Sequence, residues 1–354
     1  MLAALAFGAL LLLPESRPFR MGFTRWPSDL TLEAVTDCQK FVEDHGDIVS
    51  VMFMGGIPWT EALEGKPYSA DVQANLAYRP PKGKQVFLSI SALGTDRKSL
   101  CPYWGDKDNM PLPEEWSHRD FDDPKVIQAY TRFALDSVDR MKPEYLAIVI
   151  EANILLSKDK ARWPKFKVFY HQVYRAVKAK HPTLPVFFTT EVSHYLRLQP
   201  EDKGVDQAGE IKQLMEDSDV FAMSLYPYMA GEMPRPLRSD QLAFALSFKK
   251  PIAISESGML TRDVRLPTYK VTLTGSEEEQ VEFFNTVFGR AAADRYRFVI
   301  NFASTDYERL TAKLPAAVAE LASIWQYTGI RRSDGVPKPG QKPWDAWLAR
   351  PLSD

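Results

Sequence analysis

The sequence predicts an α/β protein built as a single (β/α)8 TIM barrel with long loops after strands 3 and 6. Three observations favour this fold. Short, β-rich apolar runs alternate with amphipathic helical stretches, as in βα units that form a parallel sheet. The apolar runs number eight, which is the number that closes a barrel. The chain of 354 residues also has room for the ~250 residues of such a barrel and for insertions.

The predicted strands share a short length and a high content of branched and aromatic residues. They span residues 20–26, 48–55, 84–91, 145–151, 184–191, 219–227, 251–256 and 297–303. Six stretches, most with apolar residues at i, i+3, i+4 and i+7, predict helices at 30–45, 124–141, 165–180, 208–217, 239–248 and 276–293. Ser276, followed three residues later by Glu279, forms a capping-box pattern that fixes the start of the last helix.

The insertions follow the carboxyl ends of strands, where barrel enzymes build their active sites. Residues 94–124, after the third run, are polar and rich in proline, and a second insertion follows the sixth run. Tyr103, Trp104 and Trp116 favour a functional role for the first insertion. We expect one barrel domain over residues 19–354 and no separate second domain.

The first 18 residues are predicted to be a signal peptide or an N-terminal hydrophobic segment. The apolar stretch from Leu2 to Leu13 has the length of a signal-peptide core and is too short to span a bilayer as a helix. Because no basic segment precedes it, an uncleaved anchor and a plain N-terminal helix are alternatives. We expect a secreted or periplasmic protein without stable membrane insertion after processing.

The composition of the chain argues against nucleic acid as a partner. The net charge of −2 and the pI of about 6.3 do not suggest a nucleic-acid-binding surface. Cys38 and Cys101 either pair in an oxidising compartment or remain free thiols. The oligomeric state is left open by the sequence.

Two of the predicted strands end in a glutamate. Glu151 ends the fourth run, YLAIVIE, and Glu256 ends the seventh, PIAISE. Both side chains should reach the mouth of the barrel, where glycosidic cleavage requires one carboxyl that donates a proton and one that attacks as an anion. Like charges about 5 Å apart drive two pKa values apart, so a close pair can supply both states near neutral pH.

The segments around these glutamates resemble the clan A retaining glycoside hydrolases, most of all the endo-galactanase-like branch. Besides the two strand ends, the resemblance is carried by DVFAMSLYPYM (219–229), FVINFASTDY (298–307) and YTGIRRSDGVPKPG (327–340). It implies an enzyme that cleaves β-glycosidic bonds in an oligo- or polysaccharide by retaining double displacement. It also implies that Glu151 is the acid/base, that Glu256 is the nucleophile, and that Tyr226 hydrogen-bonds the nucleophile.

One position departs from the pattern of this clan. An asparagine normally precedes the acid/base and binds the sugar 2-hydroxyl, whereas here that position is Ile150. An apolar side chain cannot form this bond, which strengthens in the transition state. Asn153 could replace it only if the strand end is locally rearranged. The alternative function is therefore a barrel that binds glycan without hydrolysing it.

Further candidate substrate-binding residues lie at other strand ends and in the loops that follow them. Each could instead be a packed or paired structural residue. They are Arg25 and Trp26 after the first run, Trp59 after the second, Trp116 after the third, and Glu191 and His194 after the fifth.

Two rival enzyme classes lack their usual signatures. The five histidines form no His-x-His or His-x-x-x-His pair, so no metal site is expected. The sequence contains no Gly-x-Gly-x-x-Gly and no Gly-x-x-x-x-Gly-Lys motif, so no cofactor is expected.

Overall fold

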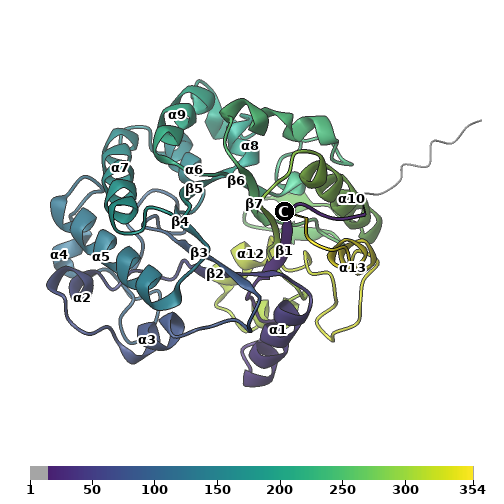
Figure 1. Cartoon of the computed structure of the whole chain (residues 1–354), viewed down its shortest axis with the longest axis horizontal. Helices are drawn as coiled ribbons and strands as arrows, with labels where there is room; N and C mark the ends of the chain where they lie inside the picture. The colour runs from purple at the N-terminus through teal and green to yellow at the C-terminus, as the bar shows by residue number, and fades with distance from the viewer. Residues whose placement is uncertain (1–14, 354) are drawn as a thin grey trace, which may run out of the picture.

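Within residues 15–353, which the computed structural model describes, eight parallel strands close into a barrel in the order β1-β10-β7-β6-β5-β4-β3-β2 (Figure 1). The (β/α)8 prediction is confirmed, and each barrel strand lies within one of the eight predicted runs except β7, which extends one residue further, to Ser257. The strands are β1 Arg20–Thr24, β2 Ile48–Phe53, β3 Gln85–Ile90, β4 Tyr145–Val149, β5 Val186–Glu191, β6 Phe221–Leu225, β7 Ile252–Ser257 and β10 Phe298–Asn301.

Helices follow the strands and surround the barrel (Figure 1). They are α1 Leu32–Asp44, α2 Trp59–Glu64, α3 Ala70–Leu76, α4 Glu114–Ser117, α5 Pro124–Met141, α6 Ala152–Lys158, α7 Trp163–Lys180, α8 Val192–Tyr195, α9 Gln207–Leu214, α10 Glu277–Ala293, α11 Glu308–Thr311, α12 Ala316–Ser323 and α13 Gln341–Leu348. Ser276 caps α10 as predicted, because its side chain accepts from the Glu279 amide at 3.1 Å. None of the helices in the described part of the chain is long and apolar enough to cross a membrane.

One predicted helix forms a tighter structure than expected. Residues 239–248 form a 3-10 helix, η4 Ser239–Phe248. Its buried side chains, Leu242 and Ala245, are three residues apart. That spacing matches the three residues per turn of a 3-10 helix.

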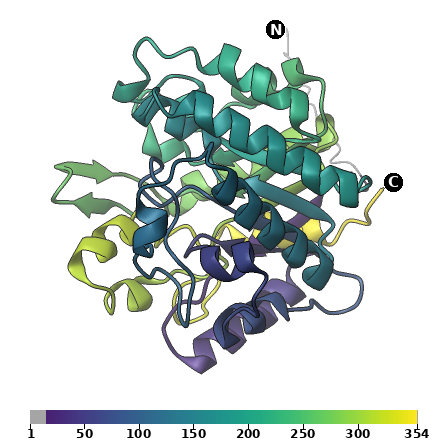
Figure 2. The same cartoon turned by 90° about the vertical axis from the view of Figure 1, so that its left-hand side faces the viewer.

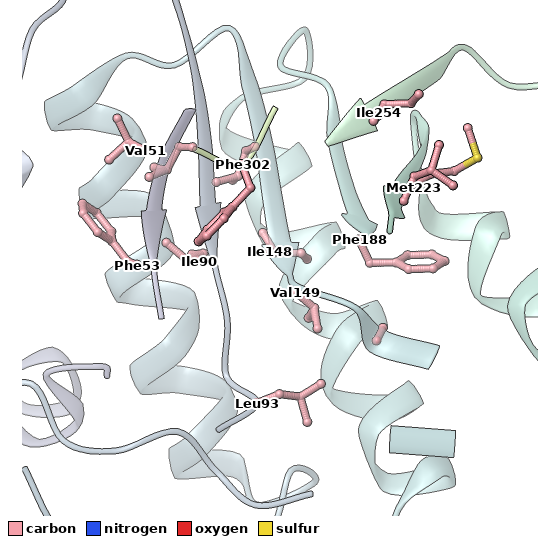
Figure 3. Close-up of a cluster of buried hydrophobic side chains, with 14 of the residues drawn as sticks. Val51, Phe53, Ile90, Leu93, Ile148, Val149, Phe188, Met223, Ile254 and Phe302 are labelled. Atoms are coloured by element: carbon pink, nitrogen blue, oxygen red, sulfur yellow. The ribbon is translucent and has the colours of Figure 1, made fainter. Parts of the chain in front are cut away.

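Two apolar layers hold the barrel together. Inside the barrel, side chains fill the lower interior, meaning the part below the mouth formed by the carboxyl ends of the strands. They are Ile48, Phe87, Ala147, Phe187, Val220, Ala222, Ala253, Phe298 and Ile300. The ring centroids of Phe87 and Phe298 lie 4.9 Å apart. The second layer packs the strands against the helices, and Figure 3 shows part of it, including Val51, Ile90, Ile148 and Ile254. A site can therefore form only above the filled interior, at the barrel mouth.

The two ends of the described chain meet at the amino ends of the strands, where Arg17 and Leu352 form a β-bridge. Arg17 pairs with Asp47 through nitrogen–oxygen distances of 2.5 and 2.9 Å. Trp344 of α13 stacks on Phe23 of β1, with 4.1 Å between ring centroids. Residues 1–14 of the predicted signal peptide lie outside the described residues. Both cysteines are buried and free, so the predicted alternative of a disulfide is wrong for this fold.

Four insertions stand at the carboxyl ends of the strands. Residues 91–123 follow β3 as predicted, and residues 226–238 follow β6 before η4. Sequence reasoning missed the hairpin of β8 Val264–Leu266 and β9 Val271–Leu273 after β7, and the long segment that carries α11 and α12 after β10. Figure 2 shows the hairpin and α12 projecting on the same side of the barrel. Thr268 at the hairpin tip hydrogen-bonds the Glu320 carboxylate of α12.

Candidate active site

A cavity of about 330 Å³ opens at the carboxyl ends of the strands. One part of its lining is polar and charged, and comes from the segments after β3, β4 and β5. The other part is mainly apolar and comes from the segments after β1 and β10. The lining comprises Trp26, Met54, Thr95, Arg97, Glu151, Ile154, Lys158, Glu191, Ser193, His194, Gln199, Met229, Glu256, Phe302, Tyr307, Val318, Leu321, Ala322, Ile324 and Trp325.

A local irregularity in β7 aims Glu256 into this cavity. Ala253 belongs to the barrel interior, and Ile254 belongs to the outer layer. Strict alternation would place Glu256 outside with Ile254. The pairing of β6 with β7 shifts register between Met223 and Ser224, which inserts one residue into β7. Such a bulge reverses the alternation, so the Glu256 carboxyl faces the mouth of the barrel.

The surroundings of Glu256 favour its protonated form. Burial, and secondly the negative charge of Glu151, raise the pKa of Glu256 to about 8. Tyr226, which follows β6, donates a hydrogen bond to the Glu256 carboxyl, and this bond and the charge of Arg97 act in the opposite direction. The predicted contact between Tyr226 and Glu256 is therefore present. Because the two glutamates share one cavity, their proton affinities are linked.

Glu151 occupies an unusual backbone conformation at the end of β4. Its φ is 50°, in the left-handed region that few residues other than glycine adopt. The Thr189 hydroxyl stabilises this turn, because it accepts a hydrogen bond from the Glu151 amide at 2.8 Å. Strain of this kind persists where the surrounding structure fixes it, often at functional sites. The result is a carboxyl that faces both Glu256 and the loop after β3.

That loop supplies an arginine that sequence reasoning missed. Arg97 donates to one Glu151 carboxyl oxygen from Nη2 at 2.6 Å and from Nε at 3.2 Å. Its own φ is 59°, and the neighbouring Asp96 carboxylate fixes the turn by accepting from the amides of Lys98 and Ser99. The only available signal was a cation in the long loop after a strand. The sequence cannot show which side chain of such a loop turns inward.

Glu191 and His194 line the cavity, yet both are already engaged. The Glu191 carboxylate caps α8, accepting from the amides of Ser193 at 3.0 Å and His194 at 2.7 Å. Burial raises the pKa of Glu191. His194 Nδ1 lies 2.9 Å from the Asp202 carboxylate. The predicted contact of both residues with substrate stays a prediction.

Aromatic side chains form the opposite wall. Trp26 packs against Phe302 with 5.3 Å between ring centroids, and Phe302 lies 6.2 Å from Trp325. The indole N–H groups of Trp26 and Trp325 have no hydrogen-bond partner among the described residues. Trp26 was predicted from its position at a strand end. Trp325 follows its strand by more than twenty residues, so no local pattern connects it to the site.

Four predicted substrate-binding residues lie elsewhere. Trp59 and Trp116 pack on one another in the core, with 5.4 Å between ring centroids, and Trp59 also packs against Tyr130 of α5. Asn153 is fully buried and exchanges hydrogen bonds with the Glu191 backbone, which joins the ends of β4 and β5. It therefore does not replace the asparagine absent at Ile150. The Arg25 guanidinium lies 3.7 Å from the centre of the Tyr78 ring, outside the cavity lining.

The remaining chemistry of the site is that of carboxyl groups. Among residues 15–353, no three His, Cys, Asp or Glu side chains are grouped so that they could hold a metal ion. Glu256 can carry a proton near neutral pH, while Glu151 is held by a guanidinium. Two carboxyl groups of different protonation in one cavity can provide a proton donor and an anion for the same reaction.

Comparison with known proteins places the chain among carbohydrate-active enzymes. Residues 101–294, more than half of the chain, match the model of glycosyl hydrolase family 53. A search of curated proteins finds no match.

Several solved structures share the fold. The GH53 catalytic domain of Ignisphaera aggregans is 14% identical, with 95% of this chain and 98% of that chain covered and a TM-score of 0.58. Native xylanase 10B from Thermotoga maritima is 12% identical, with coverage of 94% and 95% and a TM-score of 0.60. A GH5_18 enzyme from Bifidobacterium longum, solved in complex with Manb1-4GlcNAc, is 14% identical, with coverage of 95% and 80% and a TM-score of 0.62.

Proposed function

This chain belongs to glycosyl hydrolase family 53, and we propose that it cleaves β-glycosidic bonds in an oligo- or polysaccharide by retaining double displacement. The family makes it a glycoside hydrolase. The retaining course of the reaction and the residues that perform it are our proposals. We also propose that the protein acts outside the cytoplasm, because of the apolar stretch at residues 2–13.

The observation that supports this proposal most strongly is the pairing of Glu151 and Glu256 in one cavity. In the first step the ionised Glu256 carboxylate attacks the anomeric carbon, while a proton on Glu151 passes to the departing oxygen. In the second step Glu151 takes a proton from water, and that water displaces Glu256 from the sugar. Tyr226 orients Glu256 throughout through its hydrogen bond.

The aromatic wall suits the sugar that Glu256 attacks. Trp26, Phe302 and Trp325 line the cavity and present apolar ring surface on which a sugar ring can pack. Ile150 is buried and apolar. The contact that the clan makes to the 2-hydroxyl at that position must therefore come from another group or be absent.

Variants of the two glutamates test this proposal on a panel of β-linked oligosaccharides. Glu151→Ala and Glu256→Ala should each lower turnover by about a thousandfold or more while the protein stays folded, because each removes a group that reacts in the transition state. Glu278→Ala, an exposed glutamate of α10 away from the cavity, is the matched control and should retain wild-type turnover.

Two outcomes contradict the proposal. Near-normal hydrolysis by either alanine variant removes that glutamate from the mechanism. Binding of the oligosaccharides by the wild-type protein, without turnover at high protein concentration, favours the alternative of a glycan-binding barrel.

A further inference from the structure

The ion pair of Arg97 with Glu151 conflicts with the task proposed for Glu151. A proton donor must carry a proton when the substrate arrives, whereas the pair with Arg97 exists only while Glu151 is ionised. The side chains of Arg97 and Glu151 are 13% and 11% exposed, so solvent screens this attraction only partly. In the free protein Arg97 therefore pairs with Glu151 as an anion, while burial raises the pKa of Glu256, the proposed nucleophile, to about 8, which is the reverse of what the first step requires.

A neutral substrate gives no means of correcting this arrangement. Protonation of Glu151 in the presence of a neutral substrate would leave the mostly buried Arg97 guanidinium without a counter-charge. Breaking one side of a buried ion pair is strongly destabilising because it leaves an uncompensated charge. A ligand that brings its own anion to Arg97 removes this penalty.

A second cation stands beside Arg97. Lys158, in the last turn of α6, lines the same cavity, is exposed, and forms no ion pair with any described side chain. It lies near the turn that carries Arg97. Burial acts to raise the pKa of Asp96, but the amides of Lys98 and Ser99 and the Ser99 hydroxyl lower it. The charge of Lys158 also lowers this pKa, which places Lys158 near the turn. Arg97 and Lys158 are the two permanent cations among the described residues of the cavity lining.

From this arrangement we infer that the substrate carries a carboxylate on its leaving unit, and that this group takes the place of Glu151 on Arg97, with Lys158 as a second partner. The inference rests on the proposed function, because it assumes that Glu151 protonates the leaving oxygen. The leaving unit is the part of the substrate next to that proton donor. Arg97 contacts this donor directly, and Lys158 lies close enough to act on Asp96, the neighbour of Arg97.

The exchange also sets the protonation state that the reaction needs. When the substrate carboxylate occupies Arg97, Glu151 loses its counter-charge and can hold a proton without leaving the guanidinium unpaired. The proton moves from Glu256 to Glu151, directly or through one water molecule, and no other proton is gained or lost. Glu256 is left as the anionic nucleophile and Glu151 as the acid. A neutral glycan cannot displace Glu151 from Arg97, so the enzyme should prefer the acidic substrate.

The test uses β-linked oligosaccharides in which uronic acid and neutral hexose units alternate, compared with the same oligosaccharides after reduction of their carboxyl groups to primary alcohols. The wild-type enzyme should cleave the acidic form with kcat/KM at least about tenfold higher than the reduced form. Arg97→Gln should lose most of this preference, because it removes the partner of the substrate carboxylate and also frees Glu151 from its counter-charge when the reduced form is bound. Lys158→Gln should lose part of it. Lys160→Gln, which removes an exposed neighbouring cation outside the cavity lining, should keep it.

A binding measurement separates failure of this inference from failure of the proposed function. Calorimetric titration of both oligosaccharide forms into Glu256→Ala should show tighter binding of the acidic form, and adding Arg97→Gln should abolish the difference. Arg97→Lys, with thermal unfolding as a check of the fold, should restore part of the preference. Cleavage of the reduced form as fast as the acidic form, or equal loss on both forms in Arg97→Gln, overturns the inference and leaves the hydrolase intact. Absence of cleavage of either form, with charge-dependent binding present, overturns the proposed reaction alone.

Discussion

Glu256 is the residue in which position and charge are most closely linked. A one-residue bulge turns it into the cavity, and burial beside the Glu151 charge raises its pKa to about 8. The sequence allowed us to predict Glu151 and Glu256 at the barrel mouth, because strand ends can be identified from apolar runs, whereas Tyr226 was predicted from the resemblance to the clan A glycoside hydrolases. It could not reveal Arg97 or Trp325, since the inward direction of a loop side chain depends on contacts distant in sequence. For the same reason Trp59 and Trp116 were assigned to the site, although they pack in the core.

The hydrogen bond from Tyr226 gives a prediction for the pH dependence of the reaction. This bond lowers the pKa of Glu256, so Tyr226→Phe should raise it further. We expect kcat to fall by about tenfold and the acidic limb of the kcat/KM profile to move to higher pH. Tyr228→Phe is the matched control, because the buried Tyr228 hydroxyl has no partner among the described residues. Equal profiles for the two variants would show that the Tyr226 hydroxyl does not act on Glu256.

The raised pKa of Glu256 also predicts how stability depends on pH. A carboxyl whose pKa rises on folding from 4.5 to about 8 binds its proton more tightly in the folded state. Its contribution to stability is complete below about pH 4.5 and is lost as the pH rises through 8. Glu256→Gln cannot ionise, so at about pH 9 it should be more stable than the wild type by roughly 2–5 kcal/mol, and at about pH 4 nearly equal. Thermal unfolding across this range measures the difference. A constant gap at all pH values is incompatible with the shifted pKa.

At the scale of elements, a buried lysine fixes the two insertions that the sequence did not indicate. Lys338 Nζ donates to the Asp306 carboxylate at 2.6 Å, to the Thr261 hydroxyl at 2.8 Å and to the Gly329 carbonyl at 2.8 Å. These partners follow β7 and β10. Burial lowers the pKa of Lys338 and raises the pKa of Asp306 to about 7. The strands were predictable from periodicity, whereas this junction depends on three distant segments that meet only in the folded chain.

Removal of one partner of this junction should therefore be costly. Lys338→Met leaves the Asp306 carboxyl buried without its cation, and we expect the free energy of unfolding to fall by about 3–5 kcal/mol. The double variant Lys338→Met with Asp306→Asn removes both charges and should recover part of that loss. Urea denaturation measures both variants. A double variant less stable than Lys338→Met would mean that the Asp306 carboxyl does not depend on Lys338.

At the scale of the whole molecule, the barrel gathers one site from segments that lie far apart in the sequence. The lining extends from Trp26 to Trp325, and Glu151 and Glu256 come from strands separated by two others in the closed sheet. Solved glycoside hydrolase structures retain this fold over nearly the full chain at 12–14% identity. Because side-chain volume and polarity pattern are enough to specify the barrel, its mouth can change independently. The left-handed turns that join Arg97 to Glu151 are such a local feature.

The most direct test is to trap the covalent intermediate with a 2-deoxy-2-fluoro-β-glycoside of a cleaved sugar and to locate the label by mass spectrometry. The fluorine slows both steps, and a good leaving group lets the first proceed, so the glycosyl-enzyme accumulates. The account predicts that the sugar is bound to the peptide that contains Glu256, with one label per chain. A label on Glu151 or on any other residue would contradict the assignment of β7 as the source of the nucleophile.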